Sequence, residues 1–191
     1  TSVHHLTHYK YQKFISVSPQ IIRLRPAPHC KVPILSYSLK IEPSNHYINW
    51  LQDLYGNYLA RIIFPDPIKE FKIEVEVLAD VRIINPFDFF LEENANKWPF
   101  SYGSSIVEDL SVYRKKEDLG PLFNQYLNLI PQEIEGTVDF LVAINAMLER
   151  EIQYLIRMEP GVQNPEETLH LKSGSCRDSA WLLIHILRHL G

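Results

Sequence analysis

Cys176 is the residue whose type and position could support covalent chemistry. It lies in the run Ser-Gly-Ser-Cys-Arg-Asp-Ser-Ala, residues 173–180, directly before a stretch with the apolar spacing of a helix. The first turn of a helix offers unpaired N–H groups and a partial positive charge, which favour the thiolate, the form that attacks carbonyl carbon. The position therefore predicts a nucleophilic thiol.

The residues beside this cysteine are candidates for supporting roles. Gly174 would let the backbone turn tightly and leave room for a substrate beside the sulfur. The N–H of Cys176 could face a developing oxyanion, and Ser175 adjoins it. Arg177 and Asp178 could brace the site, although charged residues in a first helical turn are more often solvated or paired with neighbours.

A thiol nucleophile needs an imidazole, and the nearby sequence supplies no clear one. His185 and His189 follow Cys176 on the same helix, which puts their backbones about 13 and 20 Å away at 1.5 Å per residue. The spacing of His170 does not recommend it either. We expect no local base, and we expect Tyr154, which could lend a hydroxyl, to pack in the core instead.

Other residue types point to no second site. Cys30 lies in a proline-rich loop, and we expect it to be an ordinary thiol. His4, His5 and His8 could hold a metal, but no cysteine or carboxylate stands nearby in sequence to complete a tetrahedral set. We therefore expect neither a metal nor a cofactor.

Composition limits the classes of partner. Lys+Arg 19 against Asp+Glu 23 gives a net charge of −4, so nothing favours nucleic acid or an anionic membrane surface. Two distant cysteines do not make a disulfide framework, and no apolar run approaches the roughly 20 residues of a membrane helix. The first residues contain no apolar signal core, and the expected location is the cytoplasm.

The first part of the chain predicts an antiparallel β-sandwich. Apolar and polar residues alternate in 35–42 and again in 71–83, with the period of a half-buried strand. Asp53–Asn57, which contains Gly56, suits a reversal between antiparallel strands. The other expected strands are Leu6–Lys13, Pro19–Arg25, Ile48–Leu51 and Tyr58–Phe64.

The remainder predicts helices. Apolar residues recur every three or four positions in Thr137–Arg157, with Thr137 as the expected cap, and in Ser175–Leu190. Asn164, followed by Pro165 and two glutamates, predicts a short helix start. Two further short helices are expected near Ser104–Tyr113 and Leu119–Leu129.

These elements give an α+β chain with three parts. We expect a β domain at 1–90, a connecting segment with short helices at 91–135, and the beginning of a second domain at 136–191. The boundary near residue 90 rests on a change of composition after Ile84.

Several segments resemble bacterial transglutaminase-like proteins. The matching stretches are His5–Tyr11, Arg23–Pro26, Asp53–Asn57, Glu159–Leu169, Gly174–Leu182 and Leu187–Gly191. The resemblance implies a bacterial transglutaminase-like N-terminal β domain followed by the helical first part of a papain/transglutaminase-like core. It also implies that Cys176 is the nucleophile of a Cys-His-Asp triad that acts on peptide or protein amides through a thioester.

In that family, the histidine and aspartate come from strands after the cysteine helix. The sequence ends at Gly191, so we expect both to lie beyond residue 191 and this chain to be inactive alone. Without a following sheet, Leu183, Leu187 and Leu190 should be exposed and invite self-association. The alternative is a noncatalytic protein-binding or scaffolding module with a degenerate core.

Overall fold

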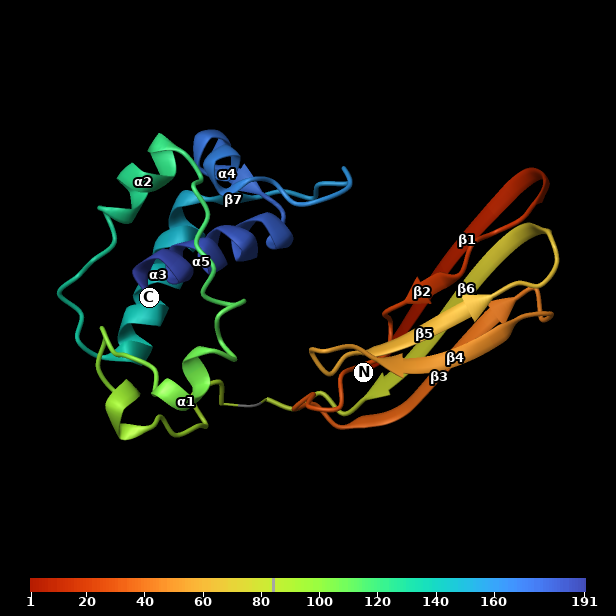
Figure 1. The fold of residues 1–191 in the computed structure, drawn as a ribbon, viewed down its shortest axis with the longest axis horizontal. Coiled ribbons are helices and arrows are strands. Elements are labelled where there is room, and N and C mark those ends of the chain that lie inside the picture. Colours follow the sequence, from red (N-terminus) through yellow and green to blue (C-terminus); the bar gives the residue numbers. More distant parts are fainter. Residues whose placement is uncertain (84) are drawn as a thin grey trace. The chain divides into compact units, whose positions relative to one another are not determined.

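The computed structural model describes residues 1–83 and 85–191 and divides the chain into two compact units, Thr1–Asp88 and Phe89–Gly191. The first unit consists of strands and the second mostly of helices (Figure 1). This arrangement confirms the predicted α+β class.

Two antiparallel sheets of three strands make up the first unit. One has the order β1-β6-β3 and the other the order β2-β5-β4. The strands are β1 Ser2–Ile15, β2 Gln20–Ile22, β3 Ile34–Glu42, β4 Tyr47–Gln52, β5 Tyr58–Ile63 and β6 Ile68–Ala79.

A hydrophobic core lies between these sheets. Phe71, Ile73 and Val75 of β6 are buried, whereas the lysine and the glutamate between them are more exposed. Ala60 and Ile62 of β5, in the other sheet, belong to the same buried cluster. The two inner faces therefore pack as a β-sandwich, as the alternating pattern predicts.

The predicted hairpin is also confirmed, between β4 and β5. Asp53 closes its turn, because its Oδ1 accepts the N–H groups of Tyr55 and Asn57, each at 2.9 Å. Gly56 has a φ of 79°, a conformation that glycine adopts without steric cost.

The alternating pattern predicts strands with buried apolar residues in 35–42 and 71–83, and this prediction is wrong at one end of each strand. Leu35 is 63% exposed, because the pairing of β3 with β6 shifts register between Ile34 and Ser36. Strand β6 ends at Ala79, and Val81 beyond it is 60% exposed. Apolar alternation therefore continues past the paired segment.

The second unit holds five α-helices and a short parallel sheet among the residues the structure describes (Figure 1). The helices are α1 Ser104–Val107, α2 Pro121–Leu127, α3 Thr137–Glu151, α4 Pro165–Leu171 and α5 Cys176–Leu190, with a 3-10 turn at Glu93–Ala95. Strands β7 Gln153–Tyr154 and β8 Ser173–Gly174 pair in parallel.

Helices α2, α3 and α5 supply most of the core of this unit. Phe123, Phe140, Ile144, Leu182 and Ile186 are each at most 1% exposed.

The exposed patch expected on α5 is absent. Leu183, Leu187 and Leu190 are partly buried and pack against that core. The prediction that they lie exposed is therefore wrong, and self-association stays a prediction.

Helix α3 is shorter than its apolar pattern predicts. It ends at Glu151, because the backbone then enters β7, where the N–H of Gln153 donates to the carbonyl of Lys172 at 2.8 Å. Thr137 does not cap it as expected. Gly136 occupies the cap position, and the Thr137 hydroxyl donates to the carbonyl of Ala95 at 2.6 Å.

Helix α4 begins as predicted and also caps its neighbour. The Asn164 side chain accepts the N–H of Glu166 at 2.9 Å. The Glu166 carboxylate accepts the N–H groups of Leu122 and Phe123 at 2.9 and 2.6 Å, at the start of α2. One glutamate therefore satisfies two N–H groups that α2 cannot pair internally.

None of the helices in the described part of the chain combines the length and apolar character needed to cross a bilayer.

Candidate active site around Cys176

Strand β8 leads directly into the cysteine helix. Gly174 ends the strand, Ser175 is the N-cap of α5, and Cys176 occupies the first helical position. Ser175 and Asp178 form a capping box, in which each side chain bonds the backbone N–H of the other residue. The N–H of Cys176 is one of the four that a helix cannot pair internally.

Asp178 is the centre of the hydrogen-bond network at this helix start. Its side chain is fully buried. Oδ2 accepts the N–H and the hydroxyl of Ser175 at 2.8 and 2.7 Å, and Oδ1 accepts the N–H of Gln163 at 2.8 Å. Of the two alternatives, solvated or paired with neighbours, the structure shows Asp178 paired.

Arg157 balances the buried carboxylate. Its Nε and Nη2 donate to Oδ2 and Oδ1 of Asp178 at 2.9 and 3.0 Å, and Nη2 also donates to the carbonyl of Gly161 at 2.9 Å. The hydrogen bond from Arg157 is the largest cause that holds the pKa of Asp178 well below its usual range; burial opposes it. The same bond raises the pKa of Arg157.

Sequence reasoning did not identify Arg157 or Gln163. They lie 21 and 15 residues before Asp178, outside any helical or strand period that could link them to it. The sequence could have indicated this pair only through the opposite charges of Arg157 and Asp178, and such charges are common on protein surfaces.

Gly174 lies close to the buried Asp178 network. A Cβ atom at this position would lie 2.9 Å from Cβ of Asp178 and 3.0 Å from Oε1 of Gln163. The absence of a side chain therefore allows β8 to approach the Asp178 network closely.

The sulfur of Cys176 is accessible. Cys176 is exposed and lines a cavity of about 520 Å³ together with residues of α3, β7 and α5. The other lining residues are Asn145, Leu148, Glu149, Ile152, Gln153, Tyr154, Ser179, Ala180 and Leu183.

Tyr154 is 64% exposed at this cavity, so the expectation that it packs in the core is wrong. Arg177 is exposed as well, with a long contact of 3.4 Å from Nη2 to the carbonyl of Glu159. Neither residue belongs to the Asp178 network.

No histidine of the described residues lines this cavity. His185 is fully buried and packs edge-on against the ring of Trp181, and burial lowers its pKa. The ring of His189 bonds the carbonyls of His185 and Glu117. The structure thus joins the cysteine, its helix cap and the Arg157–Asp178 pair, and brings no imidazole to the sulfur.

Cys30 lies in the other unit and is also exposed. It precedes no helix: the next regular element is β3. The two thiols therefore differ in local backbone structure while both reach solvent.

Comparisons with known proteins give two matches and one negative result. Residues 1–80 match the family described as the bacterial transglutaminase-like N-terminal region. No curated protein matches the sequence. The structure of a candidate cysteine protease from Cytophaga hutchinsonii is similar, with a TM-score of 0.66 and 17% identity.

That similarity covers 99% of this chain and 63% of the other chain. At this identity it shows a common fold. The chain therefore spans less than two thirds of the length of the protein it resembles.

Proposed function

We propose that this chain, which is a bacterial transglutaminase-like protein, carries the nucleophile of an enzyme that transfers or hydrolyses amides through a thioester at Cys176. The substrate would be a peptide or protein amide. The observation that carries the proposal is an exposed cysteine at the first position of a 15-residue helix, where it lines a cavity.

The position of the thiol suits such a reaction. The thiolate attacks the amide carbonyl, an S–C bond forms, and the C–N bond breaks as the amine leaves with a proton. Water or a second amine then attacks the thioester and restores the thiol. The N–H of Cys176 points from the positive end of α5 and can stabilise the oxyanion in both steps.

The buried network next to the sulfur favours this interpretation over a structural cysteine. A structural cysteine is usually buried and acts as a small apolar residue. Here the sulfur is exposed, while the adjacent Ser175 and Asp178 are buried and hydrogen-bonded. The fold therefore holds the backbone at Cys176 in place and leaves its side chain free to react.

The residues that line the cavity suit a peptide. Asn145 and Gln153 offer amide groups that can bond a peptide backbone, and Leu148, Ile152 and Leu183 offer apolar contact. The proposal assigns the imidazole and the orienting acid of the triad to polypeptide outside residues 1–191.

Thiol alkylation tests the activated nucleophile. Iodoacetamide should modify Cys176 several-fold faster than Cys30 at neutral pH. Both cysteines are exposed, but only Cys176 lies at the N-terminus of a helix, which favours the thiolate. Mass spectrometry of the intact chain and of C30S and C176S variants measures each rate. Equal, slow rates would contradict an activated nucleophile and favour a noncatalytic binding module.

A further inference from the structure

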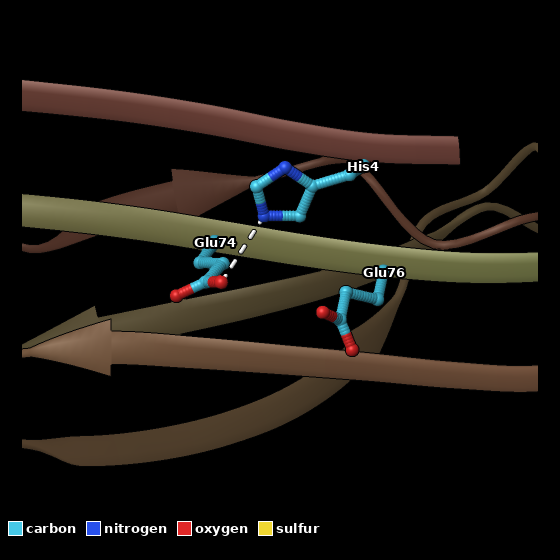
Figure 2. Close-up of side chains that lie close together, drawn as sticks. All are labelled: His4, Glu74 and Glu76. Atoms are coloured by element: carbon cyan, nitrogen blue, oxygen red, sulfur yellow. Dashed lines mark hydrogen bonds and ion pairs between the residues drawn. The ribbon is translucent and has the colours of Figure 1, made fainter. Parts of the chain in front are cut away.

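One histidine and two glutamates meet on the outer face of the β1-β6-β3 sheet. His4 of β1 is directly opposite Glu76 of β6 in the register, and Glu74 lies two residues further along β6 on the same face. One ligand atom from each side chain lies within 4.8 Å of the other two. Figure 2 shows the His4 imidazole facing a carboxylate oxygen of Glu74, with the Glu76 side chain beside them.

Two of the three side chains already interact. Nε2 of His4 lies 3.1 Å from Oε1 of Glu74. The other oxygen of Glu74 lies 3.5 Å from Nζ of Lys72.

We propose that His4, Glu74 and Glu76 bind a divalent zinc ion. One imidazole and two carboxylates form a ligand set that zinc accepts, with water completing a tetrahedron. Bonds of about 2.1 Å put tetrahedral ligand atoms roughly 3.4 Å apart, so small rotations of exposed side chains close the present separation. Zinc takes the place of the proton on Nε2 of His4, and the imidazole then carries its single proton on Nδ1, any second proton passing to solvent.

The ion links two strands that are distant in sequence. His4 and Glu74 are 70 residues apart, and β1 is an edge strand whose residues are mostly exposed. A ligand that binds only the folded arrangement stabilises it, so zinc should strengthen the pairing of β1 with β6. No carboxylate is near His4 in the sequence, but the pairing of β1 with β6 brings two beside it.

The same sheet face provides a matched control. His8 is 3.0 Å from Oε2 of Glu70, a pair with the same contact as His4–Glu74. In the register, however, His8 is opposite Lys72, whose ammonium cannot bind a cation. A site that needs two carboxylates should therefore depend on His4 and not on His8.

Zinc titration calorimetry and histidine NMR test the site. The full chain should carry C30S and C176S, so that thiols do not compete for the metal. We expect one equivalent of zinc to bind and to shift the ring signals of His4, with the dissociation constant raised more than about tenfold by H4A and by E76Q and unchanged by H8A. Circular dichroism checks that each variant folds.

Three results would contradict the proposed zinc site. Absence of zinc binding to the parent chain overturns the proposal. So does equal weakening by H4A and H8A, which indicates isolated surface histidines, or full retention of binding in E76Q. Magnesium chloride at the same concentration should leave the His4 signals in place, because magnesium prefers oxygen ligands.

Discussion

Arg157 and Asp178 form a two-point ion pair, with Nε to Oδ2 at 2.9 Å and Nη2 to Oδ1 at 3.0 Å. Arg157 comes from the segment after β7, and Asp178 from the first turn of α5. The carboxylate also accepts hydrogen bonds from Ser175 and Gln163. One buried group therefore ties Arg157 and Gln163, which lie between β7 and α4, to the helix start that carries Cys176.

Replacing Arg157 by lysine should loosen this helix start. Lysine keeps the charge but cannot donate two parallel bonds, so R157K should lower the melting temperature and reduce the alkylation rate of Cys176 relative to Cys30. Differential scanning fluorimetry and mass spectrometry measure the two effects. R177K is the matched control, since Arg177 is exposed and should tolerate lysine; equal loss in both variants would argue against a specific role for Arg157.

Asp178→Asn should destabilise the helical unit by about 3–5 kcal/mol at neutral pH, because it leaves Arg157 without its buried partner. Urea unfolding followed by the circular dichroism of the helices measures this. A loss below about 1 kcal/mol would mean that the ion pair contributes little.

D178N should also change how the free energy of unfolding varies with pH in acid. The pKa of Asp178 is lowered in the fold, so its contribution is complete above the unfolded pKa of about 3.9 and is lost as pH falls from there toward the folded pKa. The parent should therefore lose stability faster than D178N below about pH 5. Parallel curves for the two proteins would contradict the lowered pKa.

Gly174→Ala should cost about 1–3 kcal/mol, because the added methyl group would overlap Cβ of Asp178 and Oε1 of Gln163. Gly103→Ala is the control. A Cβ there meets only Oγ of Ser105, at 3.9 Å, an ordinary contact. Urea unfolding should separate the two variants, and equal stability would mean that the backbone at β8 relaxes freely.

Glu166→Gln should loosen the start of α2, because an amide keeps one acceptor where the carboxylate bonds two N–H groups. Hydrogen exchange at the amides of Leu122 and Phe123 should become faster. Glu167→Gln, in the same turn of α4 but exposed, should leave that exchange unchanged. Faster exchange in both variants would point to the charge of α4 rather than to the cap.

Local features of this chain could be predicted from adjacent residues. The turn at Asp53–Asn57, the Asn164 cap and the position of Cys176 at a helix start all depend on residues within a few positions of one another. Such contacts form from short-range hydrogen bonds and backbone preferences, which a linear pattern records. The alternating strands likewise predict which side chains line the sandwich core.

Element ends were less predictable, because partners elsewhere in the chain decide them. Apolar spacing continues past Glu151, but pairing of Gln153 with Ser173 ends α3 there. Burial of Leu187 on α5 also depends on the packing of the whole helical unit, which periodicity does not describe.

By itself, the sequence determined the α+β order of elements and the location of the candidate nucleophile at the start of an amphipathic helix. Only the tertiary structure decided that Asp178 is buried against Arg157, that Glu166 caps α2, and that His4 meets Glu74 across 70 residues. The physical reason is separation along the chain. Polar groups far apart in sequence become partners only when packing of the apolar faces brings their backbones together.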